Sequence, residues 1–188
     1  MTNLASDFGQ IDIYLFDQLL KGRVTARDRV LDAGCGSGRN LFYLLKMGCQ
    51  VSAIDTNPAA VAGVQELASE LQTGLPNANF RVEPVERTSF ADASFDVVIS
   101  SAVLHFARDA AHFEAMVGEM WRDLRPGGML FARLASTLLP DDHYSYLVSP
   151  EQLEQLTATL GGQLLDPIKT TVVHRQRAMS TWVVRKGA

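Results

Sequence analysis

Residues Val30–Asn40 read VLDAGCGSGRN, a short apolar run followed at once by glycines that alternate with small residues. Glycines at the carboxyl end of a strand let the chain turn tightly and bring backbone amides within contact distance of a ligand. The spacing of Gly34, Gly36 and Gly38 differs from the Gly-x-Gly-x-x-Gly spacing of dinucleotide-binding turns. Asp32, just before the turn, would lie unfavourably against a pyrophosphate and instead favours a ligand that carries positive charge.

A second acidic residue, Asp55, ends the next apolar run, Gln50–Asp55, about 20 residues after the glycines. A carboxylate at that strand end can accept hydrogen bonds from both hydroxyl groups of a ribose. The alternative role for Asp55 is to cap the helix that begins at Pro58. The ribose role is favoured, because the glycine turn and Asp55 fall at the ends of successive strands.

Apolar runs with strand character alternate with helical spacing along most of the chain. Strands are expected at 29–33, 50–55, 80–82, 95–100 and 129–134, and helices at 8–20, 40–47, 58–72 and 112–124. This alternation predicts an α/β fold with a doubly wound parallel sheet that helices cover on both faces. After a helix at 150–160, extended runs at 164–173 and 178–185 are joined by a connection so short that it requires an antiparallel hairpin.

The composition is that of one ordinary globular domain, and it excludes several classes of function. The 188 residues carry a formal net charge of −4 without a lysine- or arginine-rich run, which excludes a general nucleic-acid binder or a polybasic membrane binder. No apolar run is long enough to cross a bilayer, and the first residues do not resemble a signal peptide. Cys35 and Cys49 form no metal-ligand pattern, and a disulfide is not expected because Cys35 lies inside the glycine turn. These features predict a cytoplasmic protein without a metal site.

Four motifs in order along the chain resemble those of class I S-adenosylmethionine-dependent methyltransferases. They are VLDAGCGSGRN, AIDTNPAAV, SFDVVISSAVLHF and LRPGGMLFARL, and together they cover roughly residues 30 to 134. The resemblance implies a Rossmann-like, seven-stranded, mostly parallel sheet that ends in an antiparallel hairpin, with S-adenosylmethionine as the cofactor. Within the family, Arg39-Asn40 after the glycines, and His174-Arg175 followed by MSTWVVRK, are similar to the bacterial tellurite-resistance methyltransferases.

The resemblance also implies roles for residues around the glycine turn. The cofactor-binding residues would be Asp32, Gly34, Gly36, Gly38, Asp55, Thr56, Asn57, Val85, Glu86 and Ser100. The glycines would line the methionine and ribose parts of the cofactor, and Asp32 would hold its amino end directly or through water. Asp55 would accept hydrogen bonds from the ribose hydroxyl groups, with Thr56 and Asn57 beside it.

The chain departs from the family at the place where an acid after the third strand usually binds the adenine amino group. Pro84 occupies the position of that acid. Glu83 or Glu86 would substitute for it, with the backbone amide of Val85 reaching an adenine nitrogen. The alternative is that Glu83 and Glu86 form a solvated acidic turn and that packing holds the adenine.

The candidate catalytic residues lie outside the glycine turn. In this family the segment after the fourth strand passes beneath the transferable methyl group, so Ser100 and His105 are candidates for lining the site. A histidine such as His105 would serve as general base for a hydroxyl or amine acceptor, and the alternative role is packing or capping. His174 and Arg175 lie in the hairpin turn, where the resemblance implies a substrate-facing pair. Arg175 would bind an oxyanion, and the alternative is a solvated turn. His112 is expected at the exposed start of a helix.

The expected function is methyl transfer from S-adenosylmethionine to a small-molecule acceptor by in-line displacement. The chain would form a single methyltransferase domain, monomeric or homodimeric, in which residues 29–135 bind the cofactor. Residues 1–28 would form a helical cap segment, and residues 136–188 a lid loop, helix and closing hairpin. The N-terminal segment and the loop 137–146 after the fifth strand would select the acceptor. Two alternatives remain open. One is a catalytically silent S-adenosylmethionine-binding protein, which Pro84 suggests, and the other is an NAD-dependent oxidoreductase, which the glycine spacing and the final hairpin disfavour.

Overall fold

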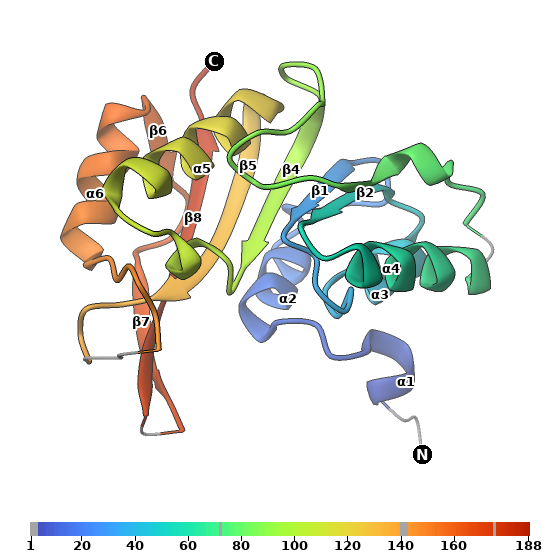
Figure 1. Cartoon of the computed structure of the whole chain (residues 1–188), viewed down its shortest axis with the longest axis horizontal. Helices are drawn as coiled ribbons and strands as arrows, with labels where there is room; N and C mark the ends of the chain where they lie inside the picture. Colours follow the sequence, from blue (N-terminus) through green and yellow to red (C-terminus); the bar gives the residue numbers. More distant parts are fainter. Residues whose placement is uncertain (1–3, 72, 140–142, 175) are drawn as a thin grey trace.

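The computed structural model describes residues 4–71, 73–139, 143–174 and 176–188. Its helices and strands are α1 (Leu4–Phe8), α2 (Ile13–Leu20), β1 (Arg29–Ala33), α3 (Leu41–Met47), β2 (Gln50–Asp55), α4 (Pro58–Glu70), β3 (Phe80–Val82), β4 (Phe95–Ser101), α5 (Ala110–Asp123), β5 (Leu124–Ala135), α6 (Pro150–Thr159), β6 (Gly162–Leu164), β7 (Lys169–Val173) and β8 (Arg177–Lys186) (Figure 1). Short 3-10 turns at Asn77–Asn79 and Leu104–Phe106 precede β3 and α5. None of the helices in these ranges is long and apolar enough to cross a bilayer.

The strands form one sheet in the order β3-β2-β1-β4-β5-β8-β6, with β7 also paired to β8. Strands β1 to β5 are paired in parallel, and β8 is antiparallel to β5. Ala33 of β1 lies opposite Ile54 of β2, so the glycine turn and Asp55 emerge at the same edge of the sheet. The predicted α/β fold, with a mostly parallel sheet and an antiparallel end, is confirmed.

The sheet holds eight strands in seven positions, because β6 and β7 share one edge of β8. The predicted continuous run at 164–173 is therefore interrupted between these two short strands. Pro167 has no N–H group to donate to the ladder. The neighbouring Asp166 forms an ion pair with Arg23, with 2.5 Å between Oδ2 and Nη1.

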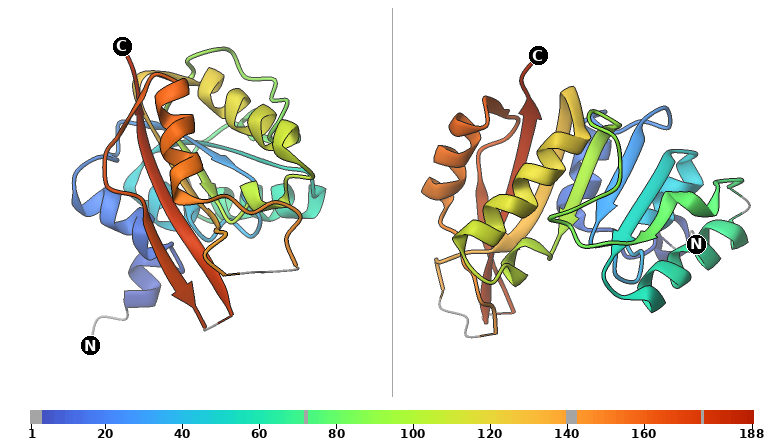
Figure 2. Two further views of the ribbon diagram at one scale, coloured as in Figure 1. Left: turned by 90° about the vertical axis from the view of Figure 1, so that its left-hand side faces the viewer. Right: turned by 45° about the horizontal axis from the view of Figure 1, so that its top comes forward.

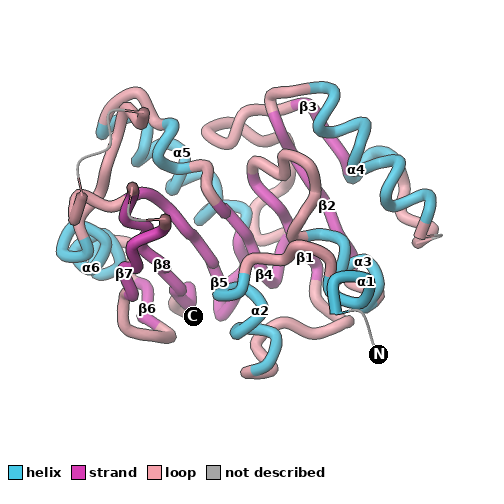
Figure 3. Tube along the Cα trace, turned by 90° about the horizontal axis from the view of Figure 1, so that it is seen from below, coloured by secondary structure: helices cyan, strands magenta, loops and turns pink. Residues whose placement is uncertain are grey.

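Alternate side chains of the central strands enter two separate cores, one on each face of the sheet. Val30 packs with the core beneath α2, α3 and α4, whereas Leu31 packs with the core beneath α5 and α6. Figure 3 shows α2 and α5 on opposite sides of the strands. Since both faces are covered, the carboxyl edge of the parallel strands is where loops can build a site. The β7–β8 hairpin projects past this edge (Figure 2).

The N-terminal segment forms two helices, and the prediction of one helix at 8–20 is wrong. Helix α1 ends at Phe8, and α2 begins only at Ile13. Asp12 is the N-cap of α2, and its buried carboxylate also accepts a hydrogen bond of 2.8 Å from Arg133 of β5. This anchor sets the start of α2 through a residue that is distant in sequence, which local apolar spacing does not reveal.

Candidate active site

A cavity of about 700 Å³ opens at the carboxyl edge of the parallel strands. Its walls come from the segments that follow β1, β2, β3 and β4 and from the first turns of α5. The lining residues are Gly34, Cys35, Gly36, Ser37, Arg39, Asn40, Asp55, Thr56, Glu83, Pro84, Val85, Glu86, Ser101, Ala102, Val103, Phe106, Arg108, His112 and Met116. The cavity therefore brings together six of the predicted cofactor-binding residues: Gly34, Gly36, Asp55, Thr56, Val85 and Glu86.

The glycine turn is held against β2 by its own backbone amides. The amide of Gly34 donates to the carbonyl of Ile54, and the amide of Gly36 donates to Asp55 Oδ2, both at 2.9 Å. Gly34 has a φ of +87°, and a Cβ added there would lie 2.5 Å from Val103 Cγ2. The turn thus approaches the segment after β4 so closely that only glycine fits without a shift.

Gly38 and Asn57 support the cavity but are not among its lining residues. Gly38 has a φ of +73°, and a Cβ there would lie 2.9 Å from Val64 Cγ2 on α4. Asn57 is the N-cap of α4, since its side chain accepts a hydrogen bond of 3.0 Å from the amide of Ala59. Both residues therefore fix the packing of α4 beside the glycine turn.

Asp55 presents its carboxylate at the cavity wall. Oδ1 accepts a hydrogen bond from the amide of Asn57, and Oδ2 accepts one from Gly36, each at 2.9 Å. Because Asn57 caps α4, Asp55 is not needed for that role. Each carboxylate oxygen has two lone pairs, so both oxygens can accept a further hydrogen bond from a ligand.

Asp32 lies behind the glycine turn, 2% exposed and outside the cavity lining. Burial raises the pKa of its carboxyl group to about 7, while the Arg39 guanidinium opposes this shift and the Asp55 carboxylate adds to it. The Asp32 carboxyl therefore changes its ionisation near neutral pH. A positively charged ligand nearby would favour the ionised form.

Glu83 and Glu86 both line the cavity from the loop after β3, and both are half-buried. Glu83 accepts hydrogen bonds from the amide of Ser89, at 2.9 Å, and from the Ser89 hydroxyl group, which ties the two ends of this loop together. Glu86 Oε1 lies 3.2 Å from His112 Nε2 at the start of α5. Glu83 therefore stabilises the loop through Ser89, whereas Glu86 lies beside His112 in the cavity wall.

His112 is a site residue that the sequence analysis missed, and the expectation that it is exposed is wrong. Its side chain is only 12% exposed and lines the cavity. Its Nδ1 accepts a hydrogen bond of 3.1 Å from the amide of Arg108, so the ring proton is on Nε2. Nε2 faces Glu86, but the geometry of the Nε2–Glu86 contact is not that of a hydrogen bond. Asp109 caps α5 and accepts a hydrogen bond of 2.8 Å from the amide of His112, which places His112 in the first turn as expected. Its position facing Glu86 depends on the packing of α5 beside the loop after β3, for which the sequence offers no local signal.

At the end of β4, Ser101 lines the cavity, whereas Ser100 is fully buried and outside the lining. Successive side chains of a strand point to opposite faces, which separates the two serines. The Ser101 hydroxyl accepts a hydrogen bond of 2.9 Å from Arg39 Nη2 and lies 3.4 Å from Asp12 Oδ2. Ser101 thereby connects the cavity to the anchor of α2.

His105 is 1% exposed and lies outside the cavity lining. Its Nδ1 accepts a hydrogen bond of 3.1 Å from the amide of Ala135, so Nδ1 is not available as a base. The ring packs against Tyr144 and Phe106, with centroids 4.0 Å and 4.7 Å away. Since Phe106 lines the cavity, His105 lies one layer behind the wall and supports it.

His174 lies at the end of β7 with a φ of +52°, and its side chain is exposed. It lines a separate hollow with His143, Tyr144, Gln176 and Arg177. His174 is thus close to the segment after β5 and is not brought into the lining of the main cavity. Arg175 lies outside the described residues.

A smaller hollow of about 260 Å³ adjoins the main cavity. Its lining residues are Arg39, Ala102, Arg133, Tyr144, Val173, Arg177 and Met179. Arg39 and Ala102 belong to both linings, so the two spaces meet at these residues. Arg133 lies within the LRPGGMLFARL motif, but its place in one lining with Arg39 depends on the pairing of β5 with β4 in the folded sheet.

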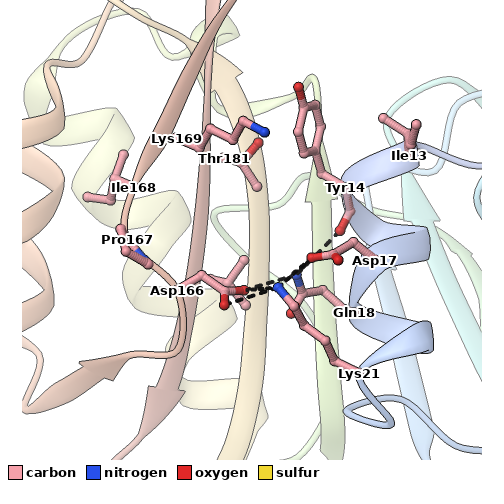
Figure 4. Close-up of a pocket in the computed structure, with 11 residues that line it drawn as sticks. Ile13, Tyr14, Asp17, Gln18, Lys21, Asp166, Pro167, Ile168, Lys169 and Thr181 are labelled. Atoms are coloured by element: carbon pink, nitrogen blue, oxygen red, sulfur yellow. Dashed lines mark hydrogen bonds and ion pairs between the residues drawn. The ribbon is translucent and has the colours of Figure 1, made fainter.

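Another cavity, of about 710 Å³, lies between α2 and the connection from β6 to β7 (Figure 4). Three of its charged side chains form ion pairs: Asp166 lies 3.1 Å from Lys21, and Lys21 lies 2.5 Å from Asp17. The fourth, Lys169, lies 5.3 Å from the centroid of the Tyr14 ring. Arg23 adds a contact of 2.5 Å to Asp166. These pairs join α2 to the antiparallel end of the sheet, and the glycine turn does not contribute to this cavity.

Residues 31–132, which contain the glycine turn and most of the parallel sheet, match the family model described as a methyltransferase domain. The chain is 30% identical over 182 residues to the malonyl-[acyl-carrier protein] O-methyltransferase of Enterobacter lignolyticus, a match that covers 89% of this chain and 68% of that protein. It is 36% identical over 104 residues to the ubiquinone biosynthesis O-methyltransferase of Methylocella silvestris, covering 55% of this chain and 38% of that protein. The chain thus spans only part of the length of these curated relatives.

Among solved structures, one similar fold is that of 1,6-didemethyltoxoflavin-N1-methyltransferase from Burkholderia thailandensis, with bound 1,6-didemethyltoxoflavin and S-adenosylhomocysteine. The TM-score is 0.74 at 22% identity, and the match covers 99% of this chain and 82% of that one. At this identity the similarity shows a common Rossmann-like fold.

Proposed function

Because the chain belongs to the methyltransferase-domain family of class I S-adenosylmethionine-dependent methyltransferases, we propose that it transfers a methyl group from this cofactor to a small-molecule acceptor. The observation that carries the proposal is the cavity wall in which Gly36 and Asp55 are hydrogen-bonded to each other. An NAD-dependent oxidoreductase is not favoured, because both the family and the glycine spacing argue against it.

The cavity suits the cofactor in size and in the groups that it offers. Its volume of about 700 Å³ lies within the range of small-molecule sites. Under this proposal Asp55, with Thr56 beside it, accepts hydrogen bonds from the ribose hydroxyl groups. Gly34 and Gly36 let the backbone lie against the methionine part, and Asp32 attracts the positively charged amino end from behind the turn.

The adenine part is proposed to lie against the loop after β3. Glu83 is engaged with Ser89, so Glu86 is the acid available to accept a hydrogen bond from the adenine amino group. His112 faces the same carboxylate and would hold it in place. This arrangement replaces the acid whose position Pro84 occupies.

When bound, S-adenosylmethionine supplies a sulfonium methyl group that is already activated. The chain's contribution is to hold the acceptor in line with that group and to exclude water. In this proposal His105 is a positioning residue that acts through Phe106, and His174 and Arg175 remain candidates on the acceptor side. Residues 1–28 and 136–188 would close the site around the acceptor.

Calorimetric titration of the purified protein with S-adenosylmethionine, S-adenosylhomocysteine and NAD tests the proposal. We expect the first two ligands to bind with dissociation constants in the micromolar range and NAD to show no heat of binding. NAD is the matched control, because it also carries an adenosine but lacks the sulfonium or thioether group. If neither adenosyl compound binds, the proposal is overturned. If both bind and a broad acceptor screen shows no transfer, the catalytically silent alternative replaces it.

A further inference from the structure

The small hollow beside the main cavity is lined by three arginines that come from distant parts of the chain. Arg39 precedes α3, Arg133 lies in β5 and Arg177 begins β8. The hollow meets the main cavity at Arg39 and Ala102. A molecule seated here would therefore lie next to the proposed cofactor site.

Over the described part of the chain, positive groups outnumber negative groups in this hollow. One carboxylate, that of Asp12, faces the arginines, with Oδ2 2.8 Å from Arg133 Nη1 and 3.5 Å from Arg39 Nη2. Arg177 Nη1 donates a hydrogen bond of 2.9 Å to the neutral Tyr144 hydroxyl group. Among the residues that the structure describes, three guanidinium groups thus face a single carboxylate, although the chain as a whole carries a formal charge of −4.

The side chain of Arg133 is also incompletely hydrogen-bonded. It is 17% exposed, its Nη1 bonds to Asp12, and its Nε is buried without a hydrogen-bond partner. A buried donor without a partner costs free energy, which marks the Arg133 side chain as incompletely satisfied by the protein itself. The Tyr144 hydroxyl accepts from Arg177, which leaves its proton free to be donated to the same ligand.

The remaining wall is apolar. Val173, Met179 and Ala102 contribute it, and the Tyr144 ring is held in place by its packing on His105 at 4.0 Å. Guanidinium groups bind planar carboxylates through paired, charge-assisted hydrogen bonds. An apolar wall beside such donors suits a carbon skeleton attached to the acid group.

We propose that this hollow is the acceptor subsite and that the acceptor is a small organic acid, whose carboxylate is held by Arg39, Arg133 and Arg177. The inference rests on the proposed function, because it places the acceptor next to the cofactor cavity. It adds the chemical class of the acceptor and assigns specificity to three arginines to which the methyltransferase motifs assign no role.

The test is a titration of the protein saturated with S-adenosylhomocysteine, using benzoate, the neutral isostere benzamide, and inorganic phosphate at constant ionic strength. We expect benzoate to bind about tenfold or more tightly than benzamide, since a charge-assisted contact is lost in the amide. Benzoate should also bind more tightly than phosphate, which cannot use the apolar wall. Equal binding of benzoate and benzamide, tighter binding of phosphate, or no binding of benzoate overturns the proposal.

Two variants and one control test whether benzoate binds in this hollow. Arg177→Gln and Arg133→Gln should each weaken benzoate binding by about fivefold to tenfold, with the affinity for S-adenosylhomocysteine unchanged. Arg185→Gln, an exposed arginine at the other end of β8, is the matched control and should change neither. Arg133→Gln removes the closest partner of the buried Asp12 carboxylate, so a loss of binding in this variant could also come from impaired folding. Arg177 is exposed at the rim of the hollow, so Arg177→Gln is the decisive variant. Loss of S-adenosylhomocysteine binding in the wild type would overturn the proposed function, whereas intact cofactor binding without an effect of Arg177→Gln overturns only the acid subsite.

Discussion

Asp55 Oδ2 accepts a hydrogen bond of 2.9 Å from the amide of Gly36, which joins the end of β2 to the turn after β1. The same carboxylate accepts a second hydrogen bond from the amide of Asn57 at the start of α4. The carboxylate is therefore held in one orientation by two backbone donors. A group that is already oriented loses little freedom when it binds a ligand.

Asp55→Ala is expected to weaken the binding of S-adenosylhomocysteine by about 100-fold, because two charge-assisted hydrogen bonds to the ribose would be lost. Calorimetric titration measures the effect. Asp92→Ala is the control, since Asp92 is an 80% exposed aspartate that pairs only at the surface with Arg122. Wild-type affinity in Asp55→Ala would refute the ribose assignment.

Gly34→Ala is expected to lower the free energy of unfolding by about 2–4 kcal/mol, from strain at its positive φ together with the contact to Val103. Thermal denaturation measures the loss. Gly22→Ala is the control, because Gly22 has a similar φ of +68° but no atom within 4 Å of the added Cβ. Val103→Ala in the Gly34→Ala background should recover part of the loss. If Gly34→Ala and Gly22→Ala lose the same stability, the close approach of the turn to Val103 has no energetic consequence.

The buried Asp32 carboxyl should make the stability of the protein fall as the pH rises from about 4 to about 7. Its pKa in the folded protein is about 7 against 3.8 for an unperturbed group, so the folded state binds the proton more tightly than the unfolded chain. The contribution is fully present below the unfolded pKa and is lost as the pH passes the folded pKa, a change of roughly 4 kcal/mol at most.

Denaturation of the wild type and of Asp32→Asn at successive pH values checks this sign. Asp32→Asn should be the more stable protein at pH 8, and most of the decline between pH 4 and 7 should be absent from it. A smaller decline is expected to remain, because burial also raises the pKa of Asp123, to about 6. Identical pH profiles of the two proteins would show that Asp32 does not titrate in this range.

The cavity of Figure 4 should serve stability and not ligand binding. Asp166→Asn removes the partner of Lys21 and Arg23, and a loss of about 1 kcal/mol, or about 2–4 °C in Tm, is expected for these partly exposed pairs. The loss should shrink at high salt, because ions screen such pairs. Titration with S-adenosylhomocysteine should give an unchanged dissociation constant, and a weakened one would mean that the position of α2 affects the cofactor site.

Local patterns in the sequence are sufficient for the elements around the glycine turn. The bounds predicted for β1 and β2 are those in the structure, and α4 begins at Pro58 as expected. Ser149 likewise caps α6 and forms a capping box with Gln152. Apolar runs, caps and tight turns act between residues a few positions apart, so their physical effect is visible in a short stretch of sequence.

Other parts of the site depend on contacts between distant segments. His112 faces Glu86 only because α5 packs beside the loop after β3, and Asp12 caps α2 where Arg133 holds it. The hollow lined by Arg39, Arg133 and Arg177 exists because β8 pairs with β5 in a register that places Arg133 opposite Thr181. That register and the crossing of β5 beside β4 are set by burial of both faces of the whole sheet. No local pattern contains this information, and only the assembled tertiary structure brings these side chains together.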